Sequence, residues 1–178
     1  MPRYVAFLRA INVGGHTVSM ARLVELFEAL DFTGVRTFIA SGNVLFNAAA
    51  KSALVERQLD RHLEAELGYR AEAFVRTVPE LAGVLANNPY PEADVASAHA
   101  LMLGFLRTAP TRAVAAKVEA MSGPTDTLQF DGRELHWLRT TRESDPKLAT
   151  TLERAIGQPM TVRNSNTIRR ILAKERGE

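Results

Sequence analysis

Two glycine-containing stretches carry the groups near the N-terminus that could bind a ligand. Residues 9–15 read RAINVGG, and residues 41–43 read SGN. Backbone N–H groups exposed at glycines can form a concave nest for phosphate or carboxylate, and a guanidinium beside them adds positive charge. The candidate ligand-binding residues are therefore Arg9, Asn12, Gly14, Gly15, Ser41 and Asn43.

Neither stretch matches an established phosphate-binding motif. INVGG is neither GxGxxG nor GxxxxGKS/T, and it lacks the lysine or acidic partner that those motifs require. A second interpretation is a plain glycine turn in which Asn12 and Asn43 hydrogen-bond the loop backbone, as asparagine readily does. The residues by themselves are compatible with both interpretations.

A third candidate is RNSNT at residues 163–167, between the last predicted strand and the terminal helix. A helix N-terminus with Arg163 beside it can bind an anion. Asn164 can instead cap the helix with no ligand present. Whether this block meets the INVGG stretch depends on how the two halves of the chain dock.

The histidines do not indicate a metal site. His16, His62, His99 and His136 show no HxH or HExxH spacing, and the chain has no cysteine. We therefore predict no metal and no cofactor. His16 adjoins the glycine pair and could act as an acid or base, although a loop histidine is more often simply solvated.

Nucleic-acid binding is a weaker alternative. Exposed Phe130, Leu135 or Trp137 on a sheet could stack on RNA bases, but the RNP1 run is absent and packed sheets would bury these side chains. The net charge of +2 is small for a dedicated nucleic-acid binder. A second possible RNA-binding surface is the arginine-rich terminal helix, whose basic residues are Arg163, Arg169, Arg170, Lys174 and Arg176.

Hydrophobic spacing and turn residues predict the same element order in both halves. The first half contains strands at 3–9, 35–40, 44–46 and 71–78, a helix capped by Ser19, a helix over 52–67 ending at Gly68, and a short helix over 79–86. Residues 87–98 are predicted to be a linker. The second half contains a strand at 99–106, a helix over 110–121, a hairpin around Asp131-Gly132, a helix from Asp145-Pro146 to Gly157, a strand at 159–163 and a terminal helix.

This order predicts an α+β fold of two successive ferredoxin-like (βαββαβ) α-β plaits, residues 1–88 and 89–178, with a C-terminal helix. In such a plait the third strand lies antiparallel between the first and second. The end of the first strand and the turn between the second and third then share one edge of the sheet. We therefore expect RAINVGG and SGN to lie side by side.

Composition is typical of a cytoplasmic protein. Hydrophobic residues make up 46% of the 178, which is enough for a packed core. No stretch is apolar enough to span a bilayer, and the N-terminus lacks the pattern of a signal peptide. We expect no membrane contact, and the sequence predicts no oligomeric state.

FLRAINVGG, SGNVLF and TVRNSNT together resemble the signatures of a bacterial domain-of-unknown-function family. Its members typically open with LLRGINVGG, continue with SGNV and close near TxRNxNT. The resemblance implies two successive α-β plaits and no established activity. Carried onto this chain, its motif positions add Gly42, Asn166 and Thr167 to the candidate residues.

The chain departs from the family pattern at two positions. Ala10 stands where the family usually has glycine, so we expect no positive φ there. Ser165 stands where the family often has tryptophan, which removes an aromatic side chain.

The leading functional hypothesis is binding of an anionic or phosphate-bearing small molecule at the INVGG and SGN loops. The alternatives are an enzyme that uses the same edge, with His16 or a carboxylate not yet located as its proton-transfer group, and an RNA-binding protein.

Overall fold

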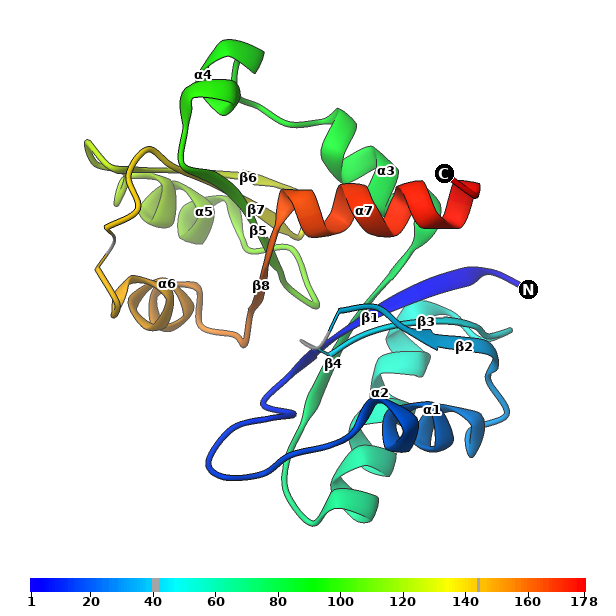
Figure 1. Ribbon diagram of the computed structural model, residues 1–178. Helices are drawn as coiled ribbons and strands as arrows, with labels where there is room; N and C mark the ends of the chain where they lie inside the picture. Colours follow the sequence, from blue (N-terminus) through cyan, green and yellow to red (C-terminus); the bar gives the residue numbers. More distant parts are fainter. Residues whose placement is uncertain (40–41, 144) are drawn as a thin grey trace. The chain divides into compact units, whose positions relative to one another are not determined.

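Each half of the chain builds a four-stranded antiparallel sheet in the computed structural model (Figure 1). The structure describes residues 1–39, 42–143 and 145–178. The chain divides into two units, Met1–Leu81 and Ala82–Glu178. Among the described residues, no helix is both long and apolar enough to cross a membrane.

The first unit has its sheet in the order β2-β3-β1-β4. Its elements are β1 (Arg3–Arg9), α1 (Met20–Glu28), β2 (Thr33–Thr37), β3 (Asn43–Asn47), α2 (Ser52–Leu67) and β4 (Glu72–Thr77). Helices α1 and α2 lie on the same side of the sheet (Figure 1) and share one apolar core with it. Helix α3 (Val78–Ala86) crosses into the second unit.

The second unit repeats this order as β6-β7-β5-β8. Its elements are α4 (Glu92–Ser97), β5 (Ala100–Phe105), α5 (Arg112–Glu119), β6 (Asp126–Asp131), β7 (Glu134–Arg139), α6 (Leu148–Ile156), β8 (Thr161–Asn164) and α7 (Ser165–Arg176). An apolar core joins α5 and α6 to the sheet through Val118, Leu152 and Trp137. The α+β class is thus confirmed, and the architecture is consistent with a two-repeat α-β plait.

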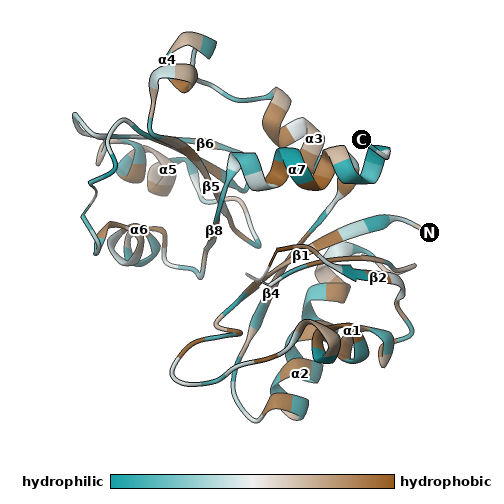
Figure 2. Cartoon of the chain, in the orientation of Figure 1, coloured by the Kyte–Doolittle hydropathy of each residue, from teal (hydrophilic) through white to brown (hydrophobic). Residues whose placement is uncertain are grey.

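Local signals place the helices of the first unit. The Ser19 hydroxyl accepts a hydrogen bond from Arg22 N at 3.1 Å, so Ser19 caps α1 as predicted. Helix α2 has the predicted bounds and ends at Gly68, whose φ of 78° is a left-handed C-cap. Both helices carry hydrophobic and hydrophilic residues along their length (Figure 2), and the apolar stripes face the core.

Several predicted boundaries were wrong, and three of them have a clear outcome in the structure. The predicted linker contains α4, whose first turn holds Glu92 and Asp94, which favour a helix N-terminus. Helix α6 starts at Leu148 rather than at Pro146, because the Asp145 carboxylate accepts a hydrogen bond from Lys147 N at 2.9 Å and closes a turn first. Strand β2 covers Thr33–Thr37 rather than residues 35–40.

Carboxylates occupy the outer edge of β4. The N–H groups of alternate residues point away from β1 and donate to Asp60 Oδ1 (from Ala73, 2.9 Å) and to Glu56 Oε1 (from Val75, 2.9 Å). The next outward N–H group along β4, that of Thr77, donates to Glu80 Oε2 at 2.6 Å. These bonds satisfy backbone donors that would otherwise pair with another strand.

The second unit closes the edge of β6 in a similar way. Leu128 N donates to the Ser122 hydroxyl at 2.9 Å, and Phe130 N donates to Glu119 Oε1 at 2.8 Å. Both acceptors come from the end of α5 and the turn that follows it. Side-chain closure of a sheet edge therefore occurs in both units.

Glu56→Ala is expected to lower the free energy of unfolding by about 3–5 kcal/mol, because removing one member of a buried ion pair leaves an uncompensated charge. Glu56 Oε1 lies 3.9 Å from Arg76 Nη1, and both side chains are buried. Chemical denaturation followed by circular dichroism measures the change. Glu64→Ala, on an exposed position of the same helix, is the control and should change the value by less than about 0.5 kcal/mol.

Candidate functional site

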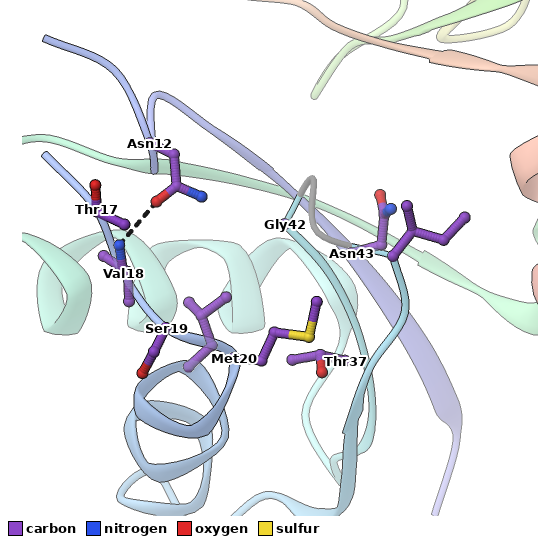
Figure 3. Close-up of a pocket in the computed structure, with 10 residues that line it drawn as sticks. Asn12, Thr17, Val18, Ser19, Met20, Thr37, Gly42 and Asn43 are labelled. Atoms are coloured by element: carbon purple, nitrogen blue, oxygen red, sulfur yellow. Dashed lines mark hydrogen bonds between the residues drawn. The ribbon is translucent and has the colours of Figure 1, made fainter. Parts of the chain in front are cut away.

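A cavity of about 260 Å³ opens in the first unit between the β1–α1 loop and the β2–β3 hairpin (Figure 3). One wall comes from the loop and the first turn of α1, and the other from the end of β2 and the start of β3. The described lining residues are Asn12, Thr17, Val18, Ser19, Met20, Leu23, Thr37, Ile39, Gly42 and Asn43.

The β1–α1 loop is held in place by side chains at both of its ends. Asn12 Oδ1 accepts a hydrogen bond from Val18 N at 2.8 Å, and the amide nitrogen of Asn12 is turned toward the hairpin (Figure 3). The Tyr69 hydroxyl donates to Ile11 O at 2.7 Å. Its ring stacks on His16 with centroids 4.0 Å apart. Burial raises the pKa of Tyr69, so the phenol remains a donor.

The β2–β3 hairpin is fastened by Asn43 and Gly42. Asn43 is fully buried, and its amide donates to Phe38 O at 3.0 Å. Gly42 O accepts a hydrogen bond from Leu8 N at 2.8 Å, which ties the hairpin to the end of β1. Gly42 has a φ of 77°, and a Cβ there would approach side chains of Leu8 and Ile11 at 3.1 Å. Only glycine fits this position without strain.

The structure brings together only some of the candidate ligand-binding residues predicted in the two glycine-containing stretches. Asn12, Gly42 and Asn43 line the cavity, and the side chains of both asparagines also hydrogen-bond loop backbone, as the turn interpretation expects. Ser41 lies outside the described residues.

Arg9, Gly14 and Gly15 are not among the described lining residues. Arg9 Nε lies 3.7 Å from a Glu72 carboxylate oxygen, and the same carboxylate lies 3.1 Å from Arg70. Arg9 and Arg70 therefore share one carboxylate, which compensates part of their positive charge. Both glycines have positive φ and lie on the exposed part of the loop.

The RNSNT block lies in the second unit. Asn164 caps α7, and its Oδ1 accepts a hydrogen bond from Asn166 N at 2.9 Å. Arg163 donates to the Thr161 hydroxyl at 2.8 Å and to Val162 O at 2.9 Å. Burial lowers the pKa of Arg163 to about 10. Thr167 lies in the first turn of α7 and is half-buried.

Ala10 was predicted to avoid positive φ, and that prediction is wrong. Its φ is 61°, in the left-handed region that the glycine of the family pattern adopts without penalty. The tight exit from β1 imposes this conformation on whichever residue follows Arg9. Ala10 therefore carries backbone strain.

The sequence pattern did not indicate the apolar half of the cavity. Met20 and Leu23 belong to the apolar pattern of α1, which predicts only a core-facing stripe, yet Met20 is 45% exposed. Ile39 is 39% exposed and has a φ of 60°, a rare conformation for a β-branched residue. The hydroxyl residues Thr17 and Ser19 stand out in the sequence only as helix-capping chemistry.

Comparison of the two units shows that the fold does not require such long loops. The connection from the first strand to the first helix covers residues 10–19 in the first unit and 106–111 in the second. The hairpin connection covers residues 38–42 against 132–133. In both units the hairpin accepts a hydrogen bond from near the end of the first strand, from Leu8 N to Gly42 O within β1 and from Leu106 N, just after β5, to Arg133 O. Described residues of both longer connections line the cavity, namely Asn12, Thr17, Val18, Ser19, Ile39 and Gly42.

The described lining residues include no His, Asp, Glu, Lys or Arg. His16, the candidate acid or base, is exposed and stacks on Tyr69 outside the lining. This arrangement counts against proton transfer in the cavity.

The RNA-stacking face proposed for the second unit is buried. Leu135 and Trp137 belong to the apolar core, and Phe130 packs against it.

His136, between Leu135 and Trp137 in the sequence, is fully buried, and neither of its ring nitrogens has a hydrogen-bond partner among the described residues. Tyr90 covers this region, its hydroxyl donating to Thr127 O at 2.8 Å and His136 O at 2.6 Å.

Comparisons with known proteins agree with the family resemblance seen in the sequence. Residues 1–136 match a family described as protein of unknown function (DUF1697). No curated protein matches the sequence significantly. The chain is similar to the solved structure of the conserved bacterial protein SP0830 from Streptococcus pneumoniae, with 22% identity, a TM-score of 0.78 and 99% of each chain covered. At this identity the likeness shows a shared fold.

Ala10→Gly is expected to raise the free energy of unfolding by up to about 1 kcal/mol. The left-handed conformation costs alanine about 1–2 kcal/mol, and the greater flexibility of unfolded glycine offsets part of the gain. Urea denaturation of both proteins measures the difference. A loss of stability would contradict the strain argued for this position.

Stability of the second unit is expected to fall as the pH drops below about 6.5, because burial lowers the pKa of His136 in the folded protein. The unfolded chain then takes up a proton that the folded chain resists, whereas above this pH both states are neutral. Urea denaturation between pH 8 and 5, followed by the fluorescence of Trp137, measures the slope. His136→Phe should flatten it, and His99→Gln, at an exposed histidine, should not.

Proposed function

The chain belongs to DUF1697, a family of proteins of unknown function, and we propose that its first unit binds a small molecule in the cavity beside Asn12. The observation that carries the proposal is the cavity itself, which combines hydrogen-bonding groups on one side with an apolar surface on the other. Small-molecule sites have this composition, a few placed polar groups in a mainly apolar pocket.

The polar side of the cavity offers hydrogen-bond donors. Asn12 Oδ1 is occupied by Val18 N, while the Asn12 amide N–H₂ has no partner within the described part of the chain. The Thr17 hydroxyl lies on the same wall. A carboxylate or carbonyl group on the ligand would accept from these donors.

The apolar side is formed by Met20, Leu23 and Ile39. The volume of about 260 Å³ lies just below the roughly 300 Å³ at which pockets for drug-sized ligands begin, so the ligand is small. A short aliphatic carboxylate or amide has the matching chemistry. A phosphate would need more positive charge than the described lining provides.

The conformation of Ile39 supports this proposal. A β-branched residue at a φ of 60° costs about 1–3 kcal/mol and Ile39 gains little from burial because it is 39% exposed. Backbone strain of this kind clusters at active sites and at residues that clamp a ligand.

We infer in addition that each unit is a ferredoxin-like plait. The support is the strand order, β2-β3-β1-β4 repeated as β6-β7-β5-β8 with every neighbouring pair antiparallel. This arrangement is what the βαββαβ connectivity predicts.

Asn12→Asp is expected to weaken binding of short aliphatic carboxylates at least tenfold. The substitution keeps the oxygen that accepts from Val18 N but replaces the amide donor by a second anionic oxygen, which repels a carboxylate. The measurement is a titration of ¹⁵N-labelled protein with butyrate, isovalerate and their amides, monitored at the amide resonances of Val18, Thr37 and Ile39.

Asn164→Asp is the matched control, since Asn164 makes the same kind of side-chain oxygen contact, to Asn166 N, in the second unit. It should leave the titration unchanged. If neither carboxylates nor amides shift the cavity resonances of the unaltered protein, the proposed function is wrong.

A further inference from the structure

We infer that the natural ligand of this cavity is the C-terminal end of an extended peptide whose backbone pairs with the outer edge of β2. The inference rests on the proposed function and names the class of ligand. It is carried by the contrast between the two edges of the first sheet and by the position of the cavity at the end of one of them.

The outer edge of β2 presents unused backbone groups at Thr37. Phe38 N donates to Asn43 O at 2.9 Å, and β2 pairs antiparallel with β3 through Thr37 opposite Val44. Because backbone groups alternate in direction along a strand, the N–H and C=O of Thr37 point away from β3. No described residue hydrogen-bonds them.

The opposite edge of the same sheet is closed. The outward N–H groups of β4 donate to Asp60, Glu56 and Glu80 at 2.9, 2.9 and 2.6 Å. An added strand would have to displace all three carboxylates there. Within the described part of the first unit, β2 is thus the edge that can accept a strand.

The open edge leads directly into the cavity. Thr37 ends β2 and lines the cavity together with Ile39. A strand added at Thr37 would deliver its next residue to Met20, Leu23 and Ile39 on the apolar side and to the Asn12 amide on the polar side. Strand addition gains affinity from main-chain hydrogen bonds, and a pocket for a side chain gives specificity.

The cavity selects the chemistry and direction of the peptide. An aliphatic side chain suits the apolar wall, and a terminal carboxylate suits the Asn12 donor. Since β2 runs toward the cavity, a peptide whose C-terminus enters the cavity runs parallel to β2. The partner is therefore a chain ending in an aliphatic residue, with at least two preceding residues in extended conformation.

The test uses the full chain and two degenerate tetrapeptide pools ending in leucine or valine, one with a free carboxylate and one with a terminal amide. The free-carboxylate pool should slow hydrogen exchange at the Thr37 N–H at least tenfold, measured by NMR. The amide pool should bind at least tenfold more weakly, because it lacks the charged acceptor for Asn12.

Thr37→Pro and Thr37→Val separate backbone pairing from side-chain contact. Proline removes an N–H that β3 does not use and is tolerated on edge strands, whereas valine keeps the N–H and removes the hydroxyl. The valine variant should bind the free-carboxylate pool and the proline variant should not, with circular dichroism of both unchanged. Equal binding by both variants overturns the inference.

The remaining outcomes distinguish this inference from the proposed function. If butyrate or isovalerate binds in an Asn12-dependent way but the peptides leave Thr37 exchange unchanged, the cavity binds small molecules and the peptide inference fails. If Thr37 is protected without peptide and increasingly so at higher protein concentration, a second copy of the chain occupies the edge and the inference also fails. If nothing binds, both are wrong.

Discussion

The antiparallel order β2-β3-β1-β4 is the constraint on which the rest of the first unit depends. Because β3 lies between β1 and β2 and runs antiparallel to both, the end of β1, the start of α1 and the β2–β3 hairpin must meet at the same end of these strands. The hydrogen bond from Leu8 N to Gly42 O, 2.8 Å long, joins the end of β1 to the hairpin there. Both connections are longer than this topology needs, as the second unit demonstrates with the same order and shorter loops, and residues of both line the cavity.

Several polar residues near this end of the strands hold the loops in place. Asn43 satisfies the hairpin backbone, Tyr69 fastens Ile11, and Glu72 lies against Arg9. Asn12 combines both roles, since its oxygen closes the β1–α1 loop while its N–H₂ group is left for another acceptor among the described residues. One side chain can therefore make the loop rigid and offer a donor in a fixed position, which would lower the entropy cost of binding at the proposed site.

The two edges of the first sheet are treated differently. Glu56 and Asp60 lie one turn apart on α2, so both carboxylates reach alternate N–H groups of β4, and Glu80 reaches the third. In the second unit Glu119 and Ser122 cover β6 in the same manner. Such closure protects against unwanted strand pairing, and it makes the open groups of Thr37 on β2 a distinguishing feature of the first unit.

The sequence by itself determined the features that depend on local interactions. The order of the strands and of the helices other than α4, strand β1, α2 with its Gly68 end and the caps at Ser19 and Asn164 follow from residue periodicity and from side chains bonding backbone a few residues away. The tertiary structure decided the rest, because it depends on contacts between distant segments. The proximity of Arg9 to Glu72, the left-handed Ala10, and the meeting of Met20 with Ile39 at one cavity arise only when the sheet brings separate strands together. Periodicity cannot distinguish an apolar residue that faces the core from one that faces a cavity, since both lie on the same stripe of the helix.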